Sequence, residues 1–297
     1  MRAGILYMIG VVILWGIIPI LVKIVLTTID PFSIAFLRLF QGTLALLVLY
    51  RIRGGQWRAL FQKNRLLLIG GAGLGINYVL FSVGLNFTTA GAAVLIIQSQ
   101  VVTFAVLAAF FLGERLTAFK IAGMIAVICG MVFVVLPQNS LGDMFSSRYT
   151  LGNVMIFVAG MTWGVYALTN KMLGRQMGSF HILIPMFTIA TLATGAVAAT
   201  QFELKRAVSL EALAAIVVLG VLCTGGSFYL VSEGMKRLSA ALVGTMTSSF
   251  PLLSLWLAHL ILGEEVTTAM FVAAALIIGG ILVMVYSERN HANSVGE

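Results

Sequence analysis

The sequence has few charged residues. Asp, Glu, Lys and Arg make up 9% of its 297 residues, whereas 60% of the residues are hydrophobic. Soluble domains carry about 25% charged and about 45–50% apolar residues. A chain so poor in charge cannot cover its apolar surface in water. The composition therefore excludes a soluble globular protein and predicts an integral membrane protein.

Residue types that carry reactive chemistry are also scarce. The two cysteines, Cys129 and Cys223, lie inside apolar runs, which argues against a disulfide framework and against a cysteine metal site. The three histidines are scattered along the chain, at His181, His259 and His291. No Ser-His-Asp set and no metal-ligand cluster is present. We therefore expect no metal, no cofactor and no enzymatic activity.

Acidic residues are absent from the middle of every apolar run. The ten acids are Asp30, Glu114, Asp143, Glu203, Glu211, Glu233, Glu264, Glu265, Glu288 and Glu297. Proton-coupled carriers and exporters of cations often use a buried carboxylate. We therefore do not expect a cationic drug as the main substrate.

Long hydrophobic runs dominate what remains. Each is long enough for a helix to cross roughly 30 Å of hydrocarbon, and none has the alternating pattern of a membrane β-strand. The predicted fold is all-α with ten transmembrane helices, at about 4–26, 32–50, 66–86, 90–112, 118–136, 152–172, 181–201, 211–232, 239–262 and 267–286. The first run is too long for a signal-peptide core, so we expect it to be retained.

Positive charge is distributed unequally between the loops. A net charge of +8 would by itself also suit a nucleic-acid partner. The basic residues lie in short loops between spans, however, and this pattern sets membrane topology. Only Arg148, Lys205 and Arg206 fall on the side opposite the N-terminus. The sequence therefore predicts a multi-pass protein of the bacterial cytoplasmic (inner) membrane, with both termini in the cytoplasm and no nucleic-acid partner.

The two halves of the chain repeat one another. Residues recur about 150 positions apart, in the pairs Gly84 and Gly234, Ala90 and Ala240, Ser99 and Ser249, Glu114 and Glu264, and Gly130 and Gly280. The predicted repeats are 4–136 and 151–287, with a polar linker at 137–150 and a cytoplasmic tail at 288–297. Five spans are an odd number, so the second repeat enters the membrane from the opposite side. Inverted repeats are typical of secondary transporters, whose substrate site lies near the midplane.

Several phrases carry a family resemblance. Trp-Gly opens both repeats, the second span reads DPFSIAFLRLF, the fourth ends in LGERLT and the fifth contains IAGMIAVICGMVFVV. Over about residues 4–286 the chain resembles the EamA-type members of the drug/metabolite transporter superfamily. The resemblance implies a ten-helix carrier with a central cavity and, in many members, export of amino acids or related metabolites. Arg38 aligns with Met186, so any role of this arginine belongs to one repeat only.

Polar and aromatic side chains gather at the middle depth of the spans. Polar atoms in hydrocarbon are costly unless they face the bundle interior or a water-filled cavity. The candidate substrate-binding residues are Trp15, Arg38, Asn77, Tyr78, Gln98, Gln100, Trp163, Tyr166, Phe228, Tyr229, Ser248 and Ser249. Aromatic faces and amides suit a small amphipathic solute. The alternative is that these groups only form hydrogen bonds between helices.

Three further side chains near the spans are basic or titratable. Arg38 either extends to the membrane interface or faces the cavity and attracts a substrate carboxylate. Lys23 lies near the outer end of its span and can reach the interface in the same way. His259 is expected to be an interfacial residue rather than a proton relay.

Two Gly-Glu phrases, LGERLT and LGEEVT, end the fourth and ninth spans. The predicted turn and cap residues are Gly113, Glu114 and Thr117 in the first repeat and Gly263, Glu264 and Thr267 in the second. Gly lets a helix stop, Thr caps the next helix, and the acid is expected beside that helix's positive end. We interpret the glutamates as parts of turns rather than as catalytic groups.

These observations predict a secondary transporter for a small metabolite, most simply an exporter of an amino acid or related compound that works by alternating access. The expected partners are this small-molecule substrate and the lipid bilayer, and the sequence makes no prediction of oligomeric state. A membrane-embedded enzyme would need a catalytic set. A receptor or scaffold would not need polar residues gathered at one depth.

Overall fold

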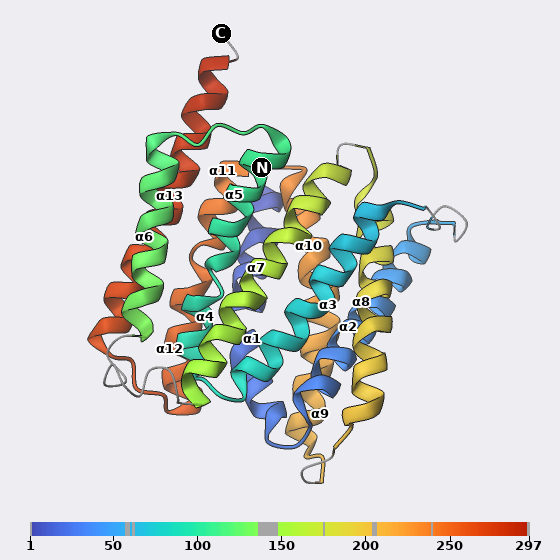
Figure 1. The fold of residues 1–297 in the computed structure, drawn as a ribbon. Helices are drawn as coiled ribbons and strands as arrows, with labels where there is room; N and C mark the ends of the chain where they lie inside the picture. The colour runs from blue at the N-terminus through green and yellow to red at the C-terminus, as the bar shows by residue number, and fades with distance from the viewer. Residues whose placement is uncertain are drawn as a thin grey trace.

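A computed structural model describes residues 2–56, 60, 63–135, 148–174, 176–203, 207–238 and 240–295. These residues are helical apart from short turns, and ten helical segments are long and apolar enough to cross a membrane. The predicted all-α class with ten spans is therefore confirmed. Both termini lie at the same end of the bundle (Figure 1), which we call the terminal face; the other end is the opposite face.

The first repeat contains six helices for five spans, because its fourth span is broken. These helices are α1 (Arg2–Leu26), α2 (Pro31–Ile52), α3 (Arg65–Leu85), α4 (Ala90–Ile96), α5 (Ser99–Leu112) and α6 (Ala118–Val135). The start of α2 illustrates how the chain ends and restarts a span: Asp30 accepts hydrogen bonds from the N–H groups of Phe32 and Ser33, both at 2.9 Å. A carboxylate at this position satisfies N–H groups that the helix itself cannot.

The second repeat is broken in the same place, and its third span is a continuous helix with a π-helical middle. Its elements are α7 (Arg148–Gly174), α8 (Ser179–Gln201), α9 (Leu210–Val217), the π-helix η4 (Val218–Gly226), α10 (Ser227–Met235), α11 (Ala240–Thr247), α12 (Phe250–Leu262) and α13 (Thr268–Val295). Helix α13 continues beyond the predicted end of its span at 286, since no Pro or Gly lies between that position and Gly296. Helix α7 begins inside the predicted linker, whose residues 137–147 lie outside the described part.

Reciprocal contacts reveal the pseudo-twofold axis between the repeats. A Cβ placed on Gly123 of α6 would lie 2.5 Å from the carbonyl oxygen of Gly280 in α13, and one on Gly130 would lie 2.8 Å from that of Ala273. Gly123 corresponds to Ala273 and Gly130 to Gly280 at the repeat offset of 150 residues, so each contact is the symmetric equivalent of the other. Thr43 also meets its own equivalent, Thr191, through a 2.9 Å hydrogen bond between their hydroxyl groups. These close approaches depend on small residues, as is common between membrane helices.

The outward surface of the described bundle is apolar. Phe110, Phe111 and Leu192 are among the large side chains that face outward, with 65–79% of their surface exposed. Such exposure is unfavourable in water, whereas lipid tails solvate it. Helices α6 and α13 lie side by side at one edge of the bundle, and α2 and α8 pack together near the other edge (Figure 1).

The two Gly-Glu turns have nearly the same backbone. Gly113 and Gly263 take left-handed conformations, with φ of 68° and 66°, which L-residues with a side chain adopt only at a cost. After each turn a threonine hydroxyl accepts a hydrogen bond from the N–H three residues later: Thr117 from Lys120 at 3.2 Å and Thr267 from Met270 at 3.3 Å. The first turn lies at the terminal face and the second at the opposite face (Figure 1).

Candidate functional site

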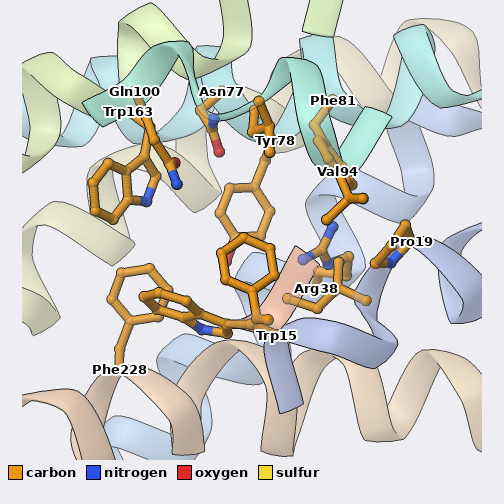
Figure 2. Close-up of a pocket in the computed structure, with 13 residues that line it drawn as sticks. Trp15, Pro19, Arg38, Asn77, Tyr78, Phe81, Val94, Gln100, Trp163 and Phe228 are labelled. Atoms are coloured by element: carbon orange, nitrogen blue, oxygen red, sulfur yellow. The ribbon is translucent and has the colours of Figure 1, made fainter. Parts of the chain in front are cut away.

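A cavity of about 90 Å³ lies between the two repeats (Figure 2). Its lining residues are Trp15, Ile18, Pro19, Arg38, Asn77, Tyr78, Phe81, Val94, Ile97, Gln100, Trp163, Phe228 and Phe250. They come from α1, α2, α3, α4, α5, α7, α10, α12 and the break after α4. One buried water needs about 10–15 Å³, so the cavity has room for several waters or for a small solute.

Aromatic rings form much of the cavity wall, with Trp15 at their centre. Its ring centroid lies 6.5 Å from that of Trp163, 6.3 Å from Phe228 and 5.9 Å from Phe250. The indole N–H of Trp15 donates to the hydroxyl of Ser227 at 3.0 Å, which fixes the ring. Edge-to-face rings of this kind pack favourably. They offer apolar faces to a solute while the polar edge of Trp15 is already satisfied.

Arg38 is the cationic residue that lines the cavity. The residue is only 3% exposed, and its guanidinium carbon lies 4.5 Å above the ring centroid of Tyr78. Its Nε has no hydrogen-bond partner, and no described carboxylate forms an ion pair with it. Of the two positions considered for this side chain, the structure places it at the cavity rather than at the membrane interface. A buried cation without a carboxylate favours an anionic ligand group.

Tyr78 links this arginine to the π-helix of the second repeat. Its hydroxyl donates to Thr224 of η4 at 3.3 Å. A Cβ added to Gly42 of α2 would lie 2.7 Å from the methyl carbon of the same threonine, so η4 packs closely on α2. Turns of π-helix are rare and are frequent at functional sites. Here the π-helix supports the ring on which the guanidinium rests.

Two amide side chains lie at the cavity from the first repeat. Asn77 donates to the carbonyl oxygen of Ala159 at 2.7 Å, so α7 holds it in place. Gln100 lines the cavity and donates to Gln98 at 3.1 Å. Both glutamines are nearly buried and lie where the span breaks between α4 and α5. Gln98 itself supports its neighbour and is not among the lining residues.

The structure brings seven of the twelve predicted site residues to the cavity: Trp15, Arg38, Asn77, Tyr78, Gln100, Trp163 and Phe228. Tyr166 lies behind them, with its ring against Trp163 and Phe228. Tyr229 stacks on Phe180, away from the lining. Ser248 and Ser249 lie between α11 and α12 and donate to carbonyl oxygens at the end of α11, at 2.7 Å each.

Six lining residues were not among the predicted candidates: Ile18, Pro19, Phe81, Val94, Ile97 and Phe250. All are apolar, and apolar residues at the middle of a span give no signal that separates a cavity wall from packing or lipid contact. Pro19 is the exception, since proline within a span marks a local irregularity. Pro19 lies one helical turn after Trp15 in the first span, so its position could have identified it from the sequence.

His259 lies away from the cavity. His259 is hydrogen-bonded through Nδ1 to the carbonyl oxygen of Glu264 at 3.0 Å, near the opposite face. In the described part of the chain no group of His, Cys, Asp or Glu is arranged to hold a metal ion. The cavity itself presents one cation, two amides and several aromatic faces.

The carboxylates of the two Gly-Glu turns have different partners. Glu264 accepts hydrogen bonds from the N–H groups of Ala90 and Gly91, at 2.8 and 2.9 Å. These groups begin α4, so the acid serves a helix of the other repeat and not α13, the expected one. Glu114 forms ion pairs with Lys120 and Lys171. Although burial would raise the pKa of Glu114, the two ammonium groups outweigh it and hold the pKa below its usual value.

Comparison with known proteins places the chain among transporters. The EamA-like transporter family matches residues 2–136 and 150–286. A relative from Escherichia coli K12, described as "Uncharacterized inner membrane transporter YhbE", is 28% identical over 87% of this chain and 81% of its own length. Another from that strain, "Probable amino-acid metabolite efflux pump", is 25% identical over 94% of this chain and 93% of its own length.

Two further similarities concern a shorter segment and the fold. The "Aromatic amino acid exporter YddG" of Ancylobacter novellus is 30% identical over 59% of this chain and 60% of its own length. A solved crystal structure that is 22% identical covers 97% of this chain and 98% of its own, with a TM-score of 0.72, and so shares the fold. With its ten spans and its matches in both halves, this chain belongs to the EamA-like transporter family of multi-pass inner-membrane proteins.

Proposed function

We propose that this protein exports a small carboxylate metabolite with an apolar or aromatic body, either an amino acid or a related compound. The observation that carries the proposal is the buried guanidinium of Arg38, which faces an aromatic-walled cavity without a carboxylate partner. A bound carboxylate would supply the missing charge. The apolar body of the solute would lie against Trp15, Trp163 and Phe228. The names of two relatives, an aromatic amino acid exporter and an amino-acid metabolite efflux pump, support this substrate class.

Transport would proceed by alternating access, with the two inverted repeats moving about the cavity. A site at the interface between inverted repeats can be exposed to either side by such a motion. The cavity has this position, since both repeats contribute to its lining. The distribution of Lys and Arg favours a cytoplasmic terminal face. Export then corresponds to loading from the terminal face and release at the opposite face.

Transport by purified protein in sealed liposomes tests the proposal. Vesicles preloaded with one unlabelled amino acid or derived carboxylic acid are given the same compound in labelled form, and exchange is followed over time. We expect exchange with aromatic and other apolar carboxylates and none with organic cations. Trp163→Ala should impair exchange, because it removes one wall of the cavity. If a folded protein exchanges no member of a broad carboxylate panel, the proposal is wrong.

The direction of insertion is tested separately. A cysteine added after Glu297 should react with an impermeant maleimide only when the cytoplasmic side of the membrane is accessible. Labelling of intact cells at this position would reverse the orientation, and with it the proposed direction of transport.

A further inference from the structure

The two glutamates of the Gly-Glu turns occupy equivalent positions but make different bonds. At the opposite face, Glu264 of the second repeat is bound to the first two N–H groups of α4, in the first repeat. At the terminal face, Glu114 of the first repeat pairs with Lys120 of its own repeat and with Lys171 at the end of α7, in the second repeat. Each carboxylate therefore ties one repeat to the other, through a different kind of partner.

Because the two halves repeat, each glutamate has two possible partners in the other repeat, a lysine and the N–H groups of a helix start. Lys171 corresponds to Lys23 of α1, and the start of α4 corresponds to the start of α11. Lys23 lies within electrostatic range of Glu264, but the two form no ion pair within 4.0 Å. Each acid thus has two possible ties to the other repeat: a lysine that ends a first-span helix, and the N–H groups that begin a fourth-span helix.

The packing of the fourth-span helices also differs between the two faces. All seven residues of α4 are buried, and the helix packs against α12. The equivalent helix, α11, contacts α1, α10 and α13, but in the described part of the chain it has no comparably extensive contact with α5. Ala92 of α4 is fully buried, whereas its equivalent Leu242 is 37% exposed. We interpret the buried α4 as closing the opposite-face half, and the less buried α11 as leaving the terminal-face half open.

We propose that Glu114 and Glu264 exchange partners during the transport cycle and so position two gates, α4 at the opposite face and α11 at the terminal face. In the structure, Glu264 holds α4 closed while Lys171 holds Glu114 away from α11. In the other state, Glu264 leaves α4 and pairs with Lys23, while Glu114 leaves Lys171 and binds the N–H groups that begin α11. This inference rests on alternating access as proposed above, and on no particular substrate.

An exchange of partners keeps both carboxylates satisfied at either end of the cycle. An acid left without a partner in a partly buried turn would penalise one state. Replacing N–H donors by an ammonium group, and the reverse, avoids that penalty. The switch also means that one gate is closed while the other is open. By pseudo-symmetry, the glutamate that binds helix N–H groups is on the closed side, and the glutamate that binds lysine is on the open side.

The lysines provide the directional test, since each is used in only one state. In full-length protein with Cys129 and Cys223 replaced by Ala, reactive cysteines are placed by Ala92→Cys or Leu242→Cys. Each is labelled with an impermeant maleimide in sealed vesicles whose orientation presents its own face to the reagent, the opposite face for position 92 and the terminal face for position 242. Lys171→Gln should raise labelling at position 92 and lower it at position 242. Lys23→Gln should change both in the reverse sense. We expect shifts of about two- to fivefold, the factor that a partly exposed ion pair contributes to an equilibrium.

Two controls separate the switch from a general loss of structure. Lys171→Arg keeps the charge and should restore the parental labelling pattern. Lys236→Gln removes a lysine at the terminal face whose ion pair in the described part of the chain is with Glu233, and should leave labelling at both positions unchanged. If Lys23→Gln and Lys171→Gln shift labelling in the same direction, or if neither shifts it, the switch is wrong. Since labelling needs no substrate, that result would leave the proposed function standing, and failed transport would leave the switch standing.

Discussion

Replacing Arg38 by Met should separate transport from stability. The substitution keeps a long apolar chain of similar shape and removes the guanidinium. A hydrogen bond to a charged group contributes about 1.5–3 kcal/mol, and about 1.4 kcal/mol corresponds to a factor of ten. Loss of the Arg38–carboxylate contact should therefore weaken the apparent affinity for substrate by roughly 10- to 150-fold. The aromatic walls formed by Trp15 and Trp163 would remain.

The same substitution should not weaken the fold. Arg38 is buried without a carboxylate partner, so its desolvation is not offset by an ion pair in the substrate-free protein. Replacing buried charge by apolar groups of similar volume is often neutral or stabilising. We therefore expect Arg38→Met to unfold at the same temperature as the parent, or at a higher one. Arg38→Lys should retain part of the transport, because it keeps the charge but loses the planar fork.

The assay combines thermal unfolding in detergent with carboxylate exchange in proteoliposomes made from the same preparation. A carboxylate that protects the parent against unfolding should not protect Arg38→Met, since ligand stabilisation follows affinity. Parental exchange by Arg38→Met would refute the role given to the guanidinium. A clear fall in its unfolding temperature would show instead that the arginine holds the bundle together.

Three further predictions concern packing, charge and capping. A Cβ on Gly160 would lie 2.0 Å from the hydroxyl of Ser99, so Gly160→Ala should destabilise the protein by about 1–3 kcal/mol, measured as a lower thermal midpoint. The lowered pKa of Glu114 stabilises the fold above the unfolded value of 4.5 and loses this effect as the pH falls through the folded pKa; Glu114→Gln should flatten that part of a stability-against-pH curve, and an unchanged curve would contradict it. Asp30→Ala should cost about 0.5–2 kcal/mol through loss of the α2 cap, and Asp30→Asn should recover most of it in the same unfolding assay.

The spans could be predicted because each one is a long apolar run in the sequence. An apolar run of sufficient length specifies a helix, since lipid offers the backbone no other hydrogen-bond partners. The breaks inside spans were not predicted, although they coincide with the polar phrases around Gln98 and Ser248. The sequence favours a cavity role for those residues, because polar atoms at mid-membrane suggest a solute. Part of their role is instead to satisfy backbone and side-chain groups where a helix stops and restarts.

The partners of the glutamates could not be derived from local sequence. The phrase LGEEVT predicts a turn and a cap, and its left-handed glycine follows from the sequence alone. That the carboxylate of Glu264 binds α4 depends on how the repeats pack, which is a property of residues about 170 positions apart. In the same way, Arg38 had two possible positions, and only the packing of η4 and Tyr78 around it decides between them.

The repeats are symmetric in their scaffold and asymmetric in their chemistry. Trp15 meets its equivalent Trp163, and Thr43 meets its equivalent Thr191, so the axis itself is built from matching residues. Arg38, by contrast, corresponds to Met186. A symmetric scaffold gives the two end states similar energies, as a carrier needs. Under the proposed function, a single cation at one side of the axis would give the solute one charged anchor, and the solute would bind in the same orientation whichever gate is open.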